Sequence, residues 1–237
     1  MIYKLKELFL IFVIKLFHKM EKLTTKEKQV QKIYLSKLQI AKRKTEKPII
    51  VAMVGLVGSG KTSVARKIAE MIGGTIIVAD DIRIHLRKLG EKFEKTRAIS
   101  ENIALEIIKQ GGNLVLDSDF IDDKKRTSLK EKIKKGTKLI FIRTYCERDI
   151  MIERIIRKLE EKFFKDAKSQ SSGINKGQIV KFREMWRRTP HHYEWVSKAG
   201  GNWILKRLPF KVINIDTTNE KKWPIVVKKE LAIFIKK

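Results

Sequence analysis

The chain has little cysteine, little proline and comparatively few acidic residues. Its 237 residues include one cysteine, Cys146, and four prolines. A single cysteine excludes an internal disulfide framework and a cysteine-rich zinc site, and it suits a reducing compartment. The low proline count and the 43% hydrophobic content argue against a disordered or fibrous chain. We therefore expect a folded, cytoplasmic protein that is long enough to bury its own core.

Long apolar runs are also absent near the N-terminus. The longest run there, residues 8–14, is much shorter than the roughly 20 residues of a membrane-spanning helix. No small-residue cleavage site of a secretory signal follows it. We expect residues 1–23 to form a partly basic helix that packs on a protein surface or lies in the plane of a membrane, as a peripheral contact. Translation from Met20 is an open alternative.

Acidic residues are half as frequent as basic ones, 27 against 54, which gives a formal net charge of +27. Such an excess indicates phosphate-bearing partners or simply a lysine-rich, solvated surface. The excess is uneven: residues 49–142 carry 18 basic and 12 acidic side chains, whereas residues 1–48 carry 13 and 4. A uniformly basic nucleic-acid-binding domain would not produce this split. The pattern favours anionic partners at the N-terminal segment and at residues 143–207.

The strongest motif follows an apolar run at residues 49–54. Gly55-Leu56-Val57-Gly58-Ser59-Gly60-Lys61-Thr62 fits the pattern G-x-x-x-x-G-K-[ST], and a helical pattern continues from it. Such a loop turns backbone N–H groups towards a phosphate, and the helix N-terminus adds its positive dipole end. We expect Lys61 to reach the β- and γ-phosphates of ATP and the Thr62 hydroxyl to ligate Mg²⁺. The predicted nucleotide-binding residues are Gly55, Val57, Gly58, Ser59, Gly60, Lys61, Thr62 and Ser63.

Further strands are predicted at residues 75–79, 113–116, 138–144 and 211–215, with helices between them. This alternation predicts an α/β fold with a parallel sheet in three α/β/α layers, as in P-loop nucleoside-triphosphate hydrolases and kinases. The expected organisation is a helical N-terminal extension over residues 1–47 and a P-loop domain over residues 48–237. Within the extension, residues 24–47 are expected to be one helix. A helical lid is expected at about residues 145–207.

Aspartates follow two of the predicted strands. Asp80 follows the second strand, and Asp117 ends the third. Carboxylates at these strand ends are placed to bind Mg²⁺ or to accept a proton from an attacking hydroxyl. For Asp81 and Asp122 we expect helix capping instead. Arg83, one helical turn beyond Asp80, is placed to hold an anionic group of an acceptor.

The order of these motifs resembles the P-loop kinases grouped around polynucleotide 5′-hydroxyl kinase and zeta toxin, which carry an AAA-type ATP-binding domain. The shared features are the P-loop, a strand followed by D-x-x-R and a strand ending in D-x-[ND], within residues 48–218. The resemblance implies that Asp80 is the general base, that Arg83 contacts the acceptor and that Asp117 is the functional aspartate of the third strand. One position departs from the family, because Asp119 stands where polynucleotide kinases tend to have Asn.

The same family closes an arginine-bearing lid over the transferred phosphate. A helix is expected at residues 147–164, which makes Arg154 and Arg157 the catalytic lid candidates, with Arg148 as the alternative. The polar residues 165–177 are expected to be flexible. Residues 181–195 mix arginine with aromatic side chains. They either bind nucleic acid or form an ordinary helix that packs Phe182, Met185 and Trp186 inward.

These observations favour an ATP- and Mg²⁺-dependent kinase that phosphorylates a hydroxyl group. The acceptor is a small molecule, a nucleotide-sugar or a nucleic-acid 5′-hydroxyl. Ser118 follows Asp117 where motor-type ATPases usually have glutamate, which favours transfer over hydrolysis. Two alternatives are an ATPase or switch that associates with a membrane or a partner through its N-terminal helix, and a basic nucleic-acid-binding protein with vestigial catalysis.

Overall fold

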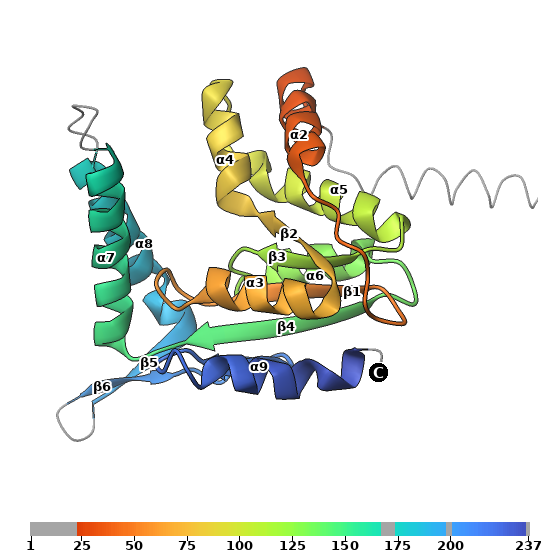
Figure 1. Cartoon of the computed structure of the whole chain (residues 1–237). Coiled ribbons are helices and arrows are strands. Elements are labelled where there is room, and N and C mark those ends of the chain that lie inside the picture. Colours follow the sequence, from red (N-terminus) through yellow and green to blue (C-terminus); the bar gives the residue numbers. More distant parts are fainter. Residues whose placement is uncertain (1–22, 167–173, 198–200, 236–237) are drawn as a thin grey trace, which may run out of the picture.

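The computed structural model describes residues 23–166, 174–197 and 201–235, and the predicted helix at residues 1–23 therefore lies almost wholly outside the described residues. Five parallel strands form the central sheet in the order β2-β3-β1-β4-β7 (Figure 1). They are β1 (Ile49–Val54), β2 (Gly74–Val78), β3 (Asn113–Asp117), β4 (Lys138–Tyr145) and β7 (Ile213–Asp216). The predicted parallel sheet is confirmed, and the last strand begins two residues later than expected.

Helices cover both faces of this sheet because β1 is apolar on both sides. Ile50, Ala52 and Val54 pack in one cluster with α2 (Thr25–Lys37), α4 (Ala79–Lys88) and α5 (Thr96–Lys109). The alternate residues of β1 pack in a second cluster with α3 (Lys61–Ile72) and α9 (Trp223–Leu231). All six residues of β1 are buried, as expected of a central parallel strand. The arrangement confirms the three α/β/α layers.

The helix in the N-terminal extension is shorter than predicted. It begins with a capping box between Thr24 and Glu27 and ends at Lys37 rather than near Lys47. The chain beyond it hydrogen-bonds elsewhere: Ala41 N–H donates to the Thr75 hydroxyl, and Lys44 N–H donates to the Ile72 carbonyl oxygen. These tertiary bonds replace the ones that a longer helix would have made.

The residues predicted to form a lid, at about 145–207, contain two helices and a hairpin in their described part. Helices α7 (Arg148–Asp166) and α8 (Ile174–His192) lie side by side at one end of the sheet (Figure 1). An antiparallel pair, β5 (Tyr193–Val196) and β6 (Asn202–Leu205), follows and was not predicted. The expectation of a flexible segment at residues 165–177 is wrong at both ends, which are helical, and residues 167–173 lie outside the described residues.

None of the helices in the described part of the chain is long and apolar enough to cross a membrane. The remaining elements are a short helical turn, η1 (Phe93–Lys95), the helix α6 (Asp123–Lys132) and a C-terminal turn, η3 (Ala232–Phe234).

Helix α2 is fastened to the edge of the sheet by Tyr34. Its hydroxyl oxygen accepts a 2.8 Å hydrogen bond from the N–H of Val78 at the end of β2. Burial raises the pKa of Tyr34 to about 12, so the phenol stays neutral. Tyr34→Phe should leave this N–H without its partner and lower the free energy of unfolding by about 1–2 kcal/mol in urea titration. Ser36→Ala, on the exposed face of the same helix, should change it by less than about 0.5 kcal/mol. An equal loss in both variants would contradict this role.

Candidate functional site

The P-loop adopts a phosphate-binding conformation between β1 and α3. Gly58 and Gly60 have φ angles of 85° and 81°, which residues other than glycine rarely adopt. The Lys61 ammonium donates to the carbonyl oxygens of Gly55 and Leu56, at 2.7 Å each. Lysine therefore folds back over its own loop, beside the backbone N–H groups at the start of α3. The Thr62 side chain is half-buried in the first turn of that helix.

The lid helices form one wall of the P-loop. A side chain at Gly58 would lie 2.6 Å from the Met151 carbonyl oxygen of α7, so only glycine fits there. Leu56 is buried in a cluster with Cys146, Met151, Ile155 and Met185, where Met185 comes from α8. The P-loop pattern allows any residue at position 56. Its apolar character was the available signal that the loop packs against a neighbouring helix.

Thr217, just beyond β7, supports the loop from a second side. Its hydroxyl lies 3.0 Å from the Ser59 carbonyl oxygen, and a side chain at Gly60 would meet it at 3.0 Å. Arg154 of α7 donates to the Thr217 hydroxyl at 3.0 Å and to its carbonyl oxygen at 2.6 Å. The Ser59 hydroxyl shares a 2.8 Å hydrogen bond with the Thr144 hydroxyl of β4. These contacts join the loop to two strands.

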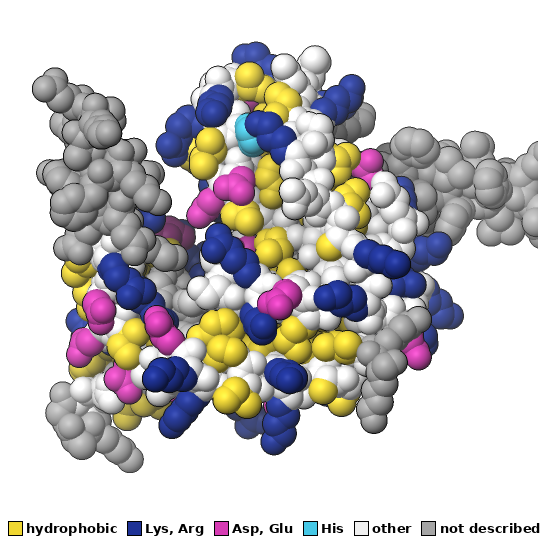
Figure 2. All heavy atoms as spheres, in the orientation of Figure 1, with side chains coloured by type: hydrophobic (Ala, Val, Ile, Leu, Met, Phe, Trp, Pro, Cys, Tyr) yellow, Lys and Arg dark blue, Asp and Glu magenta, His cyan; other side chains and the backbone are white. Residues whose placement is uncertain are grey.

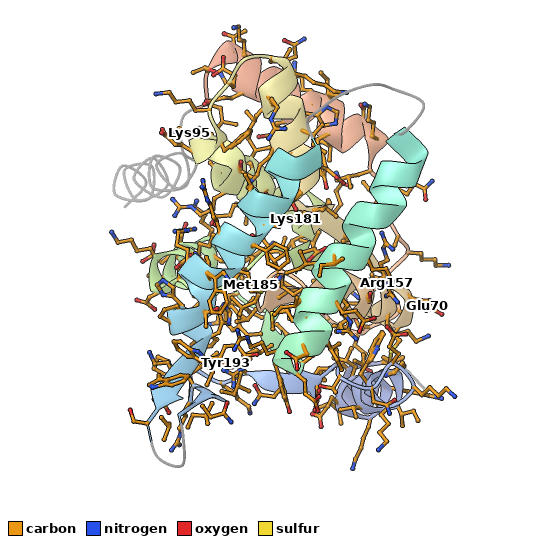
Figure 3. All side chains as sticks on the ribbon, turned by 90° about the vertical axis from the view of Figure 1, so that its left-hand side faces the viewer. Glu70, Lys95, Arg157, Lys181, Met185 and Tyr193 are labelled. Atoms are coloured by element: carbon orange, nitrogen blue, oxygen red, sulfur yellow. The ribbon has the colours of Figure 1, made fainter. Side chains whose placement is uncertain are left out.

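The lid arginines take different positions. Arg154 is held against Thr217 near the P-loop, whereas Arg157 is half-exposed and 3.9 Å from Glu220. Figure 3 looks onto α7 and α8 and shows Arg157 on α7, with Met185 on α8 and Tyr193 just after it. Arg148 stacks over the Trp186 ring at 5.1 Å, and Trp186 is 46% exposed. The expectation that Trp186 packs inward with Phe182 and Met185 is therefore wrong, because Trp186 covers an arginine at the surface.

Asp119 supports the P-loop from a third side. One carboxylate oxygen accepts hydrogen bonds from the N–H groups of Gly55 and Ile121, at 3.2 Å each. The other accepts from Arg188 of α8 at 2.7 Å and lies 3.1 Å from Nε2 of His192, which is 1% exposed. Asp119 thus joins the first P-loop glycine to the C-terminal end of the second lid helix. The sequence pattern singled out Asp119 as a departure and left His192 without a role.

This environment keeps Asp119 ionised. Burial opposes its charge, but the hydrogen bond and charge of His192, together with Lys61 and Arg188, outweigh burial and hold its pKa well below 3.8. Arg188 also reaches Asp122, 3.2 Å away. Asp122 stands at the N-cap of α6 as expected, but its side chain makes no capping hydrogen bond. The capping expectation for Asp81 is wrong, because Asp81 lies inside the first turn of α4.

The other predicted carboxylates come from β3, which is next to β1, and from the end of β2, which is next to β3. Val78 of β2 pairs with Asp117 of β3, and Asp80 follows two residues later in the first turn of α4. Asp117 is 8% exposed, and no hydrogen bond to its carboxylate is present among the described residues. Asp80 is exposed and ion-paired with Arg83 on the same helix. The sheet order therefore brings the P-loop, Asp117 and Asp80 to three adjacent strand ends.

A cavity of about 300 Å³ opens at the ends of β2 and β3. Its floor includes Ile77 and Leu116, and Arg83 lines one wall. Two further cations line the cavity: Arg97 from α5 and Lys125 from α6. No sequence pattern indicates this cavity, because its lining comes from segments up to 48 residues apart, between Ile77 and Lys125. Its position beside the Asp80–Arg83 pair makes it part of the candidate site.

A family model described as an AAA domain matches residues 50–170, which are 121 of the 237 residues. The chain belongs to this AAA domain family. The matched region contains the P-loop, Asp80, Asp117, Asp119 and Arg154. No curated protein matches this chain significantly.

The chain is similar to several solved structures. A protein from Chloroflexus aurantiacus with a provisional kinase assignment has 16% identity and a TM-score of 0.53, over 81% of this chain and 100% of its own. A gluconokinase from Sinorhizobium meliloti has 17% identity and a TM-score of 0.43, over 81% and 94%. A shikimate kinase from Acinetobacter baumannii has 16% identity and a TM-score of 0.39, over 80% and 93%. The first of these similarities agrees with the parallel sheet and the P-loop described above, and the fold is therefore a three-layer α/β/α P-loop fold.

The lowered pKa of Asp119 predicts that the stability of the protein depends on pH. A carboxylate whose pKa is lower folded than unfolded stabilises the fold above about pH 4, and this stabilisation is lost as the pH falls below that value. Asp119→Asn should lower the free energy of unfolding at pH 7 by about 3 kcal/mol, because Arg188 and Gly55 N–H lose a charged partner. The loss should shrink below pH 4 in urea titrations. Asp149→Asn, which is exposed in the first turn of α7, is the control and should cost less than about 1 kcal/mol. A loss for Asp119→Asn that does not change with pH would contradict the assignment.

Proposed function

We propose that the protein is an ATP-dependent kinase that transfers the γ-phosphate to a hydroxyl group. The observation that carries the proposal is the position of Lys61 over the P-loop, beside left-handed glycines and the start of α3. When ATP enters, its phosphates replace the Gly55 and Leu56 carbonyl oxygens as partners of the ammonium. The loop N–H groups bind the same phosphates, and the loop backbone already has the conformation that this requires.

The oxygen donors beside the loop fit a magnesium ion. Mg²⁺ prefers a few carboxylate or hydroxyl oxygens together with water and substrate phosphates. Asp117 supplies a carboxylate that is buried and without a hydrogen bond in the described residues, and Thr62 supplies a hydroxyl at the P-loop end of α3. The bound ion would neutralise charge on the phosphates. Thr62 and Asp117 are accordingly its proposed ligands.

Asp80 and Arg83 carry the acceptor side of the proposed reaction. The acceptor oxygen attacks the γ-phosphorus, the bond to the bridging oxygen of ADP breaks, and the hydroxyl proton passes to the Asp80 carboxylate. Arg83 orients Asp80 and lines the adjoining cavity. Arg154 already contacts Thr217 beside the loop, and Arg157 lies one turn further along α7. Both are proposed to approach the transferred phosphate when the lid closes.

The closer resemblance to polynucleotide 5′-hydroxyl kinase and zeta toxin stays a prediction. The Asp80–Arg83 pair and the strand-end Asp117 support it, whereas Asp119 differs from the pattern and is engaged by Arg188. A hydrolytic switch is less well supported, because Ser118 occupies the position of a water-activating glutamate.

Lys61→Ala tests the proposed nucleotide chemistry. Removing the charge on the β- and γ-phosphates should lower ATP-dependent phosphate transfer by roughly 100- to 1,000-fold, measured with γ-labelled ATP. The matched control is Lys67→Ala in the same helix, whose ammonium pairs with Glu70 and should leave transfer within about twofold. Full activity of Lys61→Ala would disprove the assignment of the P-loop.

Asp80→Asn separates catalysis from nucleotide binding. Loss of the proton acceptor should lower turnover by about 100-fold or more while the dissociation constant for ATP stays within about twofold. Asp81→Asn, the exposed neighbour, should retain turnover. Equal turnover of Asp80→Asn and wild type would reject Asp80 as the base, and label released only as free phosphate would identify a hydrolase.

A further inference from the structure

Three cations from three different helices line the cavity at the ends of β2 and β3. Arg83 comes from α4, Arg97 from α5 and Lys125 from α6. On the face shown in Figure 2, Lys and Arg are scattered without a single large patch. In the cavity, by contrast, three cations from three helices converge on one small space.

One buried carboxylate of the cavity, Glu101, is shared by two cations, so it does not neutralise both of them. Glu101 is 1% exposed, and its carboxylate is already paired with Lys132 and hydrogen-bonded to Ser128, 3.0 Å away. Arg97 forms an ion pair of 3.7 Å with the other oxygen of Glu101, and both residues line the cavity. Glu94, the second acid of the lining, is exposed on the short turn before α5.

Lys125 is a buried cation with oxygen partners that carry no full charge. Its ammonium donates to the Asp119 carbonyl oxygen at 2.8 Å and to the Ser118 hydroxyl at 3.3 Å. Burial lowers the pKa of Lys125, and the nearby charges of Asp119 and Asp122 only partly oppose this effect. A bound anion would compensate the buried charge.

The size and remaining lining of the cavity limit the ligand. Its volume of about 300 Å³ is at the small end of ligand sites, which typically measure about 300–1,000 Å³. Phe93 and Phe120 supply apolar surface, while Thr96 and Ser100 supply hydroxyl groups. This lining fits a compact metabolite with one charged group and a short polar skeleton, and it has no room for several stacked bases.

We propose that the phosphate acceptor is a small organic anion whose carboxylate or phosphate group is bound between Arg97 and Lys125. This inference rests on the proposed kinase function, because Arg83 joins the cavity to Asp80. With the anionic group at Arg97 and Lys125, a hydroxyl elsewhere on the molecule faces Asp80. That hydroxyl oxygen forms the new bond to the γ-phosphorus, its proton goes to Asp80, and ADP leaves.

Binding is tested without turnover. The full chain is loaded with Mg²⁺ and a non-hydrolysable ATP analogue, so that added anions do not occupy the P-loop. Saturation-transfer NMR then compares matched probes: glycerate and glycerol phosphate against glycerol, and gluconate and glucose 6-phosphate against glucose. We expect binding only of acids, and the carboxylate and phosphate arms show which group the cavity prefers. Absence of binding by every acid would overturn the inference.

Variants assign the binding to the cavity. Arg97→Gln should lower the affinity for the acid about tenfold or more, whereas Arg97→Lys should retain part of that affinity. Lys109→Gln, exposed in the same helix, removes the same charge outside the cavity and should have no effect. Thermal unfolding shows whether each variant is folded. If folded Arg97→Gln binds like wild type, or Lys109→Gln loses as much affinity, the proposed site is wrong.

Phosphate transfer separates the two proposals. With γ-labelled ATP, the acids that bind should be phosphorylated in preference to the neutral probes and to 5′-hydroxyl oligonucleotides. Preferred transfer to a neutral probe or an oligonucleotide would overturn the anionic class while the kinase function stands. An acid that binds through Arg97 but is never phosphorylated would instead contradict the kinase function.

Discussion

The candidate site depends on holding a glycine-rich backbone in one conformation while its N–H groups point towards a ligand. Gly58 and Gly60 can adopt left-handed φ angles, but glycine alone would leave the loop free to take others. Three contacts from outside the motif restrict it: Asp119 on the Gly55 N–H, Thr217 on the Ser59 carbonyl, and Met151 against Gly58. The loop is thereby preorganised before a phosphate binds, which is the condition for effective electrostatic stabilisation.

The same contacts connect the lid helices to both sides of the site. Arg154 of α7 reaches Thr217 on the β7 side, and Arg188 of α8 reaches Asp119 on the β3 side. A movement of the two helices would therefore act on the P-loop through two charged hydrogen-bond networks. Beyond Asp119, Lys125 carries the second network to the cavity proposed for the acceptor. Asp119 therefore connects the P-loop, α8 and this cavity, while Thr217 connects the P-loop to α7.

The sequence predicts the features that depend on neighbouring residues and misses those that depend on distant ones. The apolar run of β1 and the P-loop motif are local, and the structure has the strand where they indicate it. The pairing of Asp119 with Arg188 spans 69 residues, and no spacing rule identifies it. Likewise, α2 ends at Lys37 because the following residues bond to β2 and α3. The ligand roles of Lys61 and Asp80 remain predictions.

Hydrogen–deuterium exchange on the full chain tests the central claim most directly. Addition of ATP and Mg²⁺ should slow exchange of the backbone amides in residues 55–63, where phosphates replace water as hydrogen-bond partners. AMP at the same concentration, which lacks the β- and γ-phosphates, should leave these amides nearly unchanged. Unaltered exchange of residues 55–63 with saturating ATP and Mg²⁺, or equal protection by AMP, would contradict the account.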